Sequence, residues 1–127
     1  MAGIRGRDTR PELAVRKYLH RTGLRFRLNV GSLPGRPDLV FPRYRTVVFV
    51  HGCFWHRHPG CRFAYRPQSN TEFWEAKLDG NAVRDEVVRQ SLRDLGWAVL
   101  VIWECEAQDP RALANLAASI RSDRTLA

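Results

Sequence analysis

The chain has 127 residues and a formal net charge of +8, with a sequence pI near 10.4. This length favours one domain over residues 1–127, with a flexible basic arm at residues 1–7 and a frayed tail at residues 121–127. The excess of basic residues indicates a polyanionic partner, with nucleic acid the first candidate and an anionic membrane the second.

Two absences bear on where the protein works. The sequence has no apolar run near the ~20 residues of a membrane span and no hydrophobic segment of the signal-peptide type, so we expect a cytoplasmic protein with no membrane partner. The odd number of cysteines, three, argues against disulfides and favours thiols that are buried or bound to a metal.

A helix is expected to begin at Thr9, because Thr9 and Glu12 have capping-box spacing and Pro11 is tolerated in a first turn. Gly23 is expected to end it. Its apolar face is predicted to consist of Leu13, Ala14, Tyr18 and Leu19.

Strands are predicted next. Residues 24–29 alternate between apolar and polar, and residues 37–41 and 46–50 form two further strands joined by a tight turn at residues 42–45. So short a hairpin brings Asp38 close to Val50 and His51. Residues 97–103 are apolar throughout, as in a strand covered on both faces.

Two helical patterns complete the chain. The first follows a capped turn that carries Phe73 and Trp74, ends at Gly96, and has an apolar face of Val83, Val87, Leu92 and Leu95. The second covers residues 110–120 and buries Leu113, Leu116 and Ile120. The order α-β-β-β-α-β-α predicts an α/β fold with a mixed sheet and helices on its faces.

Residues 51–61 concentrate metal-binding side chains, with three of the four histidines and two of the three cysteines. Cys53, His58 and Cys61 have C-x4-H-x2-C spacing, and Cys105 follows the last predicted strand, so a sheet that joins the two strand ends completes a Cys3His zinc site. The alternative is that the cysteines are small buried hydrophobes.

Three further residues are candidates for chemistry. His51 and His56 remain outside the predicted zinc site, and imidazole titrates near neutral pH, so both are candidates for acid–base work. Asp38, with a nearby backbone carbonyl, is a candidate Mg²⁺ ligand, and such a site implies phosphoryl chemistry. The alternative is that Asp38 only ends a turn.

With these residues in place, the chain resembles the very short patch repair (Vsr) endonucleases. The matching segments are LPGRPDLV at residues 33–40, FVHGCFWH at residues 49–56, TEFW at residues 71–74, LGW at residues 95–97 and WEC at residues 103–105. They occur in the family's order, and the resemblance runs from about Arg5 to Cys105, most of the chain.

The resemblance implies a restriction-endonuclease-like fold with a structural zinc, and a Mg²⁺-dependent enzyme that nicks one strand of double-stranded DNA next to a T:G mismatch. The metal ligands it implies are Asp38 and the Val50 carbonyl for Mg²⁺, and Cys53, His58, Cys61 and Cys105 for Zn²⁺. The catalytic residues it implies are Asp38, His51, His56 and Glu12, although Glu12 is equally well explained by capping.

The resemblance also implies that aromatic rings enter the DNA beside the mismatch, where unstacking costs less than in a paired step. These rings fall on Phe54, Trp55 and Trp74, whereas we expect Trp97 and Trp103 to pack in the core.

We therefore predict a monomeric DNA endonuclease of mismatch repair that works beside other mismatch-repair proteins, with His56 as the base that activates water and His51 acting on the phosphate. One alternative is a related nuclease of different DNA specificity. The other is a zinc-stabilised DNA-binding module that does not cleave.

Overall fold

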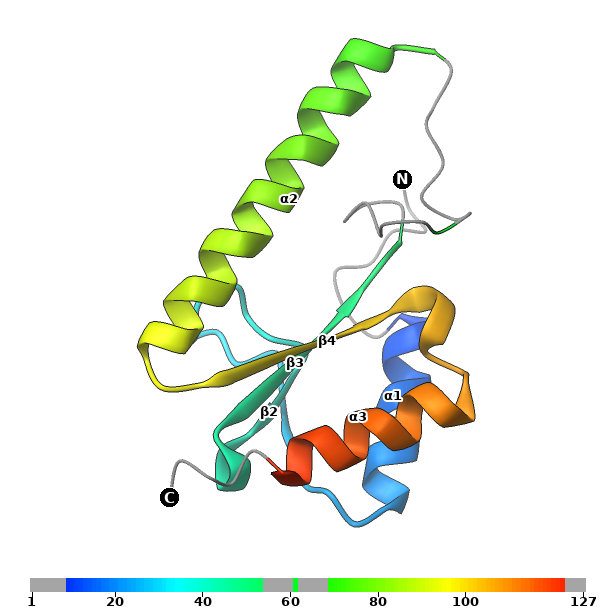
Figure 1. The fold of residues 1–127 in the computed structure, drawn as a ribbon, viewed down its shortest axis with the longest axis vertical. Coiled ribbons are helices and arrows are strands. Elements are labelled where there is room, and N and C mark those ends of the chain that lie inside the picture. The colour runs from blue at the N-terminus through cyan, green and yellow to red at the C-terminus, as the bar shows by residue number, and fades with distance from the viewer. Residues whose placement is uncertain (1–8, 54–60, 62–68, 123–127) are drawn as a thin grey trace.

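The computed structural model describes residues 9–53, Cys61 and residues 69–122 (Figure 1). The helices are α1 (Arg10–Arg21), α2 (Thr71–Asp94) and α3 (Pro110–Ser122), and the 3₁₀ turns are η1 (Pro42–Tyr44) and η2 (Glu104–Glu106). The strands are β1 (Arg27–Leu28), β2 (Leu39–Phe41), β3 (Thr46–His51) and β4 (Ala98–Trp103). This order confirms the predicted succession of helices and strands.

The strands form one mixed sheet in the order β1-β2-β3-β4. The pairs β1–β2 and β2–β3 are antiparallel, whereas β3 and β4 are parallel and in register from Thr46↔Ala98 to His51↔Trp103. Parallel strands point their carboxyl ends at the same edge of the sheet. The chain segments that follow His51 and Trp103 therefore start side by side.

Helices cover both faces of the sheet, because alternate residues of the central strands are apolar on each side. Figure 1 looks along the plane of the sheet, with α2 on one side and α1 and α3 on the other. The core under α1 and α3 includes Val15, Leu19, Val48, Ile102, Leu116 and Ile120. The core under α2 includes Val40, Val47, Phe49 and Leu92. The predicted α/β architecture with flanking helices is thus confirmed.

The predicted apolar face of α1 is confirmed for Leu19 and for Tyr18, which packs against the core, and is wrong for Leu13. Leu13 is 50% exposed, whereas Val15 and Leu19 are fully buried and Glu12 is 4% exposed. One residue turns a helix by about 100°, so the buried row follows Glu12, Val15 and Leu19. Thr9 caps the helix as predicted, since its hydroxyl accepts a hydrogen bond from the Glu12 N–H.

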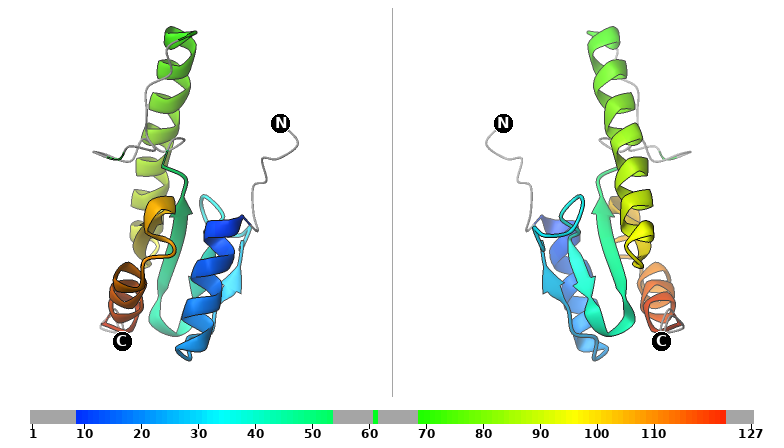
Figure 2. Two further views of the ribbon diagram at one scale, coloured as in Figure 1. Left: turned by 90° about the vertical axis from the view of Figure 1, so that its right-hand side faces the viewer. Right: turned by 90° about the vertical axis from the view of Figure 1, so that its left-hand side faces the viewer.

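The predicted apolar face of α2 is confirmed for Leu92, which is fully buried with Leu78, and is wrong for Val83, Val87 and Leu95, which are exposed. The expected turn with Phe73 and Trp74 is the start of this same helix. A 24-residue helix is about 36 Å long, against about 20 Å for six-residue strands such as β3 and β4. The amino-terminal half of α2 therefore extends past the sheet (Figure 2).

Smaller departures concern strand ends. The first strand is only Arg27–Leu28, and β2 starts at Leu39, after Asp38, while β3 continues to His51. Gly96 ends α2 as predicted, with φ +92° and a hydrogen bond from the Trp97 N–H to the Leu92 carbonyl. None of the helices in the described part of the chain combines the length and apolar composition of a membrane crossing.

Candidate active site and cysteine cluster

Asp38 stands at the start of β2 and reaches across the hairpin to β3. Its Oδ2 accepts a hydrogen bond of 2.7 Å from the backbone N–H of Val50, in a register that pairs Leu39 with Val48. The hairpin therefore brings Asp38 to the strand end that leads into His51, as the sequence predicted.

The surroundings of Asp38 disfavour an isolated negative charge. Burial raises the pKa of Asp38 from its ordinary 3.8 to about 6, and the Glu12 carboxylate contributes to the rise. The bond from Val50 and the charge of Arg16 act in the opposite direction. A bound cation would offset the repulsion between these two poorly solvated carboxylates.

Glu12 is held from two sides in the first turns of α1. The Thr9 hydroxyl donates to Oε2 at 3.2 Å, and the Arg16 guanidinium donates to Oε1 at 3.2 Å. Glu12 therefore takes part in the helix start and also lies near Asp38, so its two expected roles are compatible. Sequence reasoning did not mark Arg16, although its i,i+4 spacing from Glu12 indicates such an ion pair.

His51 ends β3 and is 6% exposed. Its ring meets the ring of Trp103 at a centroid distance of 5.3 Å, close to T-shaped, and the ring of Phe49 at 5.7 Å. The aromatic contacts restrict the imidazole at the sheet edge, beside the strand residue that Asp38 contacts. Trp97 packs against the core under α2, as expected, while Trp103 is half-buried and packs on His51.

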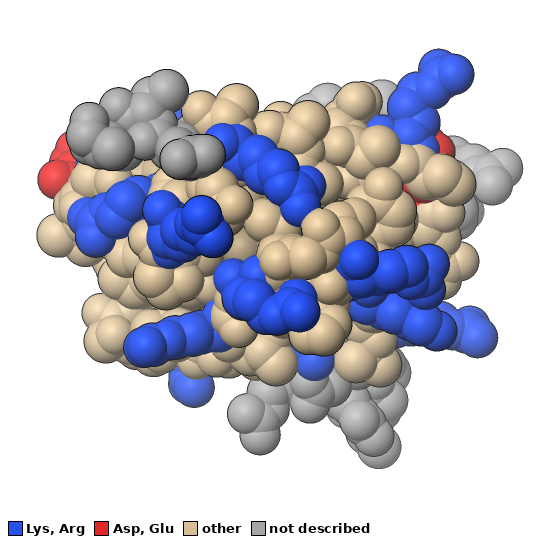
Figure 3. Space-filling view, turned by 90° about the horizontal axis from the view of Figure 1, so that it is seen from below, with Lys and Arg blue, Asp and Glu red and all other residues tan. Residues whose placement is uncertain are grey.

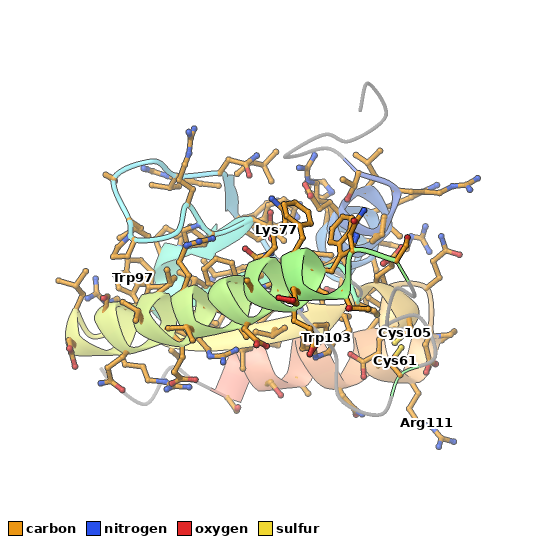
Figure 4. All side chains as sticks on the ribbon, turned by 90° about the horizontal axis from the view of Figure 1, so that it is seen from above. Cys61, Lys77, Trp97, Trp103, Cys105 and Arg111 are labelled. Carbon is orange, nitrogen blue, oxygen red and sulfur yellow. The ribbon has the colours of Figure 1, made fainter. Side chains whose placement is uncertain are left out.

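Three thiols meet at the same edge of the sheet. The Sγ atoms of Cys53, Cys61 and Cys105 all lie within 4.8 Å of one another. Figure 4 shows Cys61 and Cys105 next to each other, with Trp97 far away along the sheet. Cys53 and Cys61 follow β3 and Cys105 follows β4, so their meeting confirms that the two strand ends gather them.

The thiol cluster suits a metal better than it suits free thiolates. Burial raises the pKa of Cys53, and loss of water around the sulfur together with the two neighbouring thiols raises the pKa of Cys105 to about 12. A cation would reverse this effect, because thiolates are the form that binds a metal. Glu104 supports the arrangement, since its carboxylate accepts from the Cys53 N–H at 3.3 Å.

Trp74 lies on the part of α2 that extends past the sheet. It is half-buried and meets the exposed ring of Phe73 at 5.2 Å. Lys77 follows one helical turn later, on the side of α2 that faces α1 (Figure 4). The remaining predicted site residues, Phe54, Trp55, His56 and His58, lie outside the described residues.

Comparison with known proteins identifies the class of enzyme to which this arrangement belongs. The sequence model of the family described as DNA mismatch endonuclease Vsr matches residues 1–62. The type II nicking enzyme V.XorIIP of Xanthomonas oryzae pv. oryzae is 50% identical over 113 residues, which is 89% of this chain and 82% of that protein.

Two further relatives agree. The DNA mismatch endonuclease Vsr of Escherichia coli is 43% identical over 121 residues, 95% of this chain and 77% of that protein. The type II nicking enzyme V.NmeAIP of Neisseria meningitidis is 43% identical over 109 residues, 86% of this chain and 77% of that protein. The chain belongs to the Vsr family of DNA endonucleases.

Proposed function

We propose that the protein is a Mg²⁺-dependent endonuclease that nicks one strand of double-stranded DNA next to a T:G mismatch, on a single restriction-endonuclease-like domain. The observation that carries this proposal is the bond between Asp38 and the Val50 N–H, made beside Glu12 at the strand end that leads into His51. The relatives' names support the reaction, since they include mismatch endonuclease and nicking enzyme.

The carboxylate of Asp38 and the backbone carbonyl of Val50 would hold Mg²⁺. The fit rests on the buried carboxylate pair, whose mutual repulsion a divalent cation would offset. When bound, Mg²⁺ supplies charge stabilisation for the phosphate undergoing hydrolysis. Glu12, fixed by Thr9 and Arg16, adds a second carboxylate whose charge acts on Asp38.

The imidazoles would move the protons of the reaction. His56 accepts the proton of the attacking water, and His51 donates to the phosphate or its leaving oxygen. The rings of Trp103 and Phe49 orient His51 and keep water from one side of it. Both groups come from the segment that begins at the carboxyl end of β3, so one strand end delivers them together with Val50.

Zinc would be structural, bound by Cys53, His58, Cys61 and Cys105. Four protein ligands leave no open position for water, and the clustered thiols provide three of the four. The metal would fix the segment that carries His56. Phe54, Trp55 and Trp74 would enter the DNA stack, and the half-exposed position of Trp74 on the extended part of α2 supports this role.

A nicking assay tests the proposal. Duplexes with one T:G pair and fully paired duplexes of the same sequence are incubated with enzyme, with or without added Mg²⁺. We expect a nick in one strand of the mismatched duplex only, and only with Mg²⁺. Cutting of another mismatch or of an abasic duplex instead would identify a nuclease of different specificity, and binding without any cutting would identify a DNA-binding module.

A further inference from the structure

The end of the sheet opposite to the candidate active site is a separate basic surface. Here the amino ends of β3 and β4 meet the carboxyl ends of α1 and α3. The Ala98 N–H donates to the Arg45 carbonyl at 2.8 Å, and the Arg121 guanidinium donates to the Thr22 carbonyl at 2.7 Å. Turns and helix ends that are distant in sequence thus form one continuous face.

This face carries exposed arginines from four segments. We call it the basic face and define it by Arg21, Arg25, Arg43, Arg45 and Arg121. Figure 3 views the molecule from this end and shows blue side chains across the surface, with red ones only towards its margins. Much of the charge of +8 therefore lies away from the candidate active site.

Helix capping accounts for part of this pattern. Arginines near helix carboxyl ends offset the helix dipole and bind the last carbonyls. Arg25 donates to the His20 carbonyl at 3.2 Å, and Arg45 donates to the Leu95 carbonyl at 3.1 Å. Capping does not account for Arg43, which is exposed and lies over the ring of Tyr44 at 5.8 Å.

The caps also prepare the face for a polyanion. A guanidinium has five N–H donors, so one bond to a carbonyl leaves others for a phosphate. Because Arg25, Arg45 and Arg121 are already fixed by carbonyls, they lose less side-chain freedom when they bind. Two of the anchoring carbonyls lie at the carboxyl end of α1 and the third at the carboxyl end of α2, so the spacing of the charges is fixed as well.

We propose that the basic face binds the phosphate backbone of a second stretch of double-stranded DNA, separate from the stretch at the candidate active site. The two ends of the six-residue strands lie about 20 Å apart and face in opposite directions. DNA is stiff over about 150 base pairs, so one short duplex cannot reach both ends. Contacts to phosphates carry no sequence information, which suits a face that holds any duplex.

The inference goes beyond nicking, and a two-duplex capture experiment tests it. The protein is saturated with a bead-bound T:G duplex of about 20 base pairs, shorter than the persistence length, without added Mg²⁺, and a fluorescent, fully paired duplex is added. Wild-type protein should retain the second duplex. Arg21→Gln with Arg43→Gln should retain at least ~10-fold less and should reduce the salt slope of retention by about two, one for each lost phosphate contact.

Two matched variants make the result specific. Arg84→Gln with Arg111→Gln removes the same charge from exposed positions on α2 and α3 outside the basic face, and it should retain the second duplex as wild type does. Arg21→Lys with Arg43→Lys keeps the charge and should restore most of the retention. Melting temperatures of all variants should agree, because these side chains are exposed.

The outcomes separate this proposal from the proposed function. Equal retention by the Arg21→Gln/Arg43→Gln and Arg84→Gln/Arg111→Gln variants would overturn the basic face as the second site. Retention of labelled polyglutamate but not of duplex would also overturn it, in favour of an acidic protein partner. Nicking of the T:G duplex in Mg²⁺ should be the same in the Arg21→Gln/Arg43→Gln variant as in wild type. If the wild-type protein does not nick this duplex at all, the proposed function is refuted, but the second DNA site is not.

Discussion

The two candidate centres at the carboxyl edge of the sheet are built differently. The Asp38 site is held by the fold itself, since Asp38 bonds to the adjacent strand and Glu12 is fixed by its own helix. The cysteine cluster instead joins the segments after β3 and β4, and its thiols disfavour ionisation without a metal. In the proposed function the first centre is preformed and would receive its metal, whereas the second would need its metal to be stable.

The largest effect should come from breaking the cysteine cluster. Cys105→Ser removes one thiolate of the proposed zinc site, and loss of a structural metal removes folding free energy directly. We expect the free energy of unfolding to fall by at least about 3 kcal/mol, together with loss of bound zinc.

The control is Gln108→Ser, three residues away and exposed, which should change neither property. Zinc content and urea melts of the two variants decide the matter. One equivalent of zinc retained in Cys105→Ser would remove Cys105 from the site.

Changing the preformed Asp38 site should have the opposite effect: the nicking rate should fall and the protein should still fold. Asp38→Asn retains an oxygen that can accept from Val50 but loses the charge that would hold Mg²⁺. Single-turnover nicking of a T:G duplex should slow at least ~100-fold, about 2.7 kcal/mol in the barrier.

Binding of the duplex at low salt should stay near wild type, since affinity comes mainly from phosphate contacts. Asp79→Asn, exposed on α2, is the matched control and should nick normally. A wild-type nicking rate in Asp38→Asn would contradict the magnesium site itself.

Gly35 tests how the fold preforms the Asp38 site. Gly35 has φ +73°, and a Cβ there would lie 2.5 Å from the Val88 Cγ1 of α2, so the loop before Asp38 packs directly on that helix. Gly35→Ala should destabilise the protein by about 2 kcal/mol, from backbone strain and overpacking. It should also slow nicking while zinc content is unchanged.

Gly80 provides the comparison for Gly35. It lies inside α2 with open space where the methyl group of an alanine would stand, so Gly80→Ala should stabilise the protein by about 0.5–1 kcal/mol. Urea melts of both variants measure these changes. Equal stability of the two variants would mean that the loop does not depend on its contact with Val88.

The sequence allowed the Asp38 hairpin and the meeting of Cys53 with Cys105 to be predicted, because short turns and parallel strand ends leave few geometries. It misjudged part of the apolar faces of α1 and α2, because hydrophobicity alone does not say how a helix is rotated or how much of it meets the sheet. Val83 and Val87 look like core residues, yet both are exposed on α2. Arg16 and Glu104 were missed because their roles depend on contacts rather than on a motif.

The smallest effect should be a pH dependence that belongs to Asp38 alone. Because burial raises the pKa of Asp38 to about 6, the folded protein without Mg²⁺ binds this proton more tightly than the unfolded chain does. The contribution of Asp38 to stability therefore falls as pH rises from about 4 to about 6, and the loss is complete above that range. Asp38→Asn cannot ionise, so it removes the cost of a buried charge. The variant should be more stable than wild type at pH 7 by on the order of 1 kcal/mol, with a smaller difference at pH 4.

Added Mg²⁺ should stabilise wild type at pH 7 and leave Asp38→Asn unchanged, because a ligand that binds only the folded state raises stability by mass action. Urea melts at several pH values measure the difference, with Asp79→Asn as the control. A difference between wild type and Asp38→Asn that does not change with pH would show that Asp38 is ionised without cost, and the site would then need no cation to offset it.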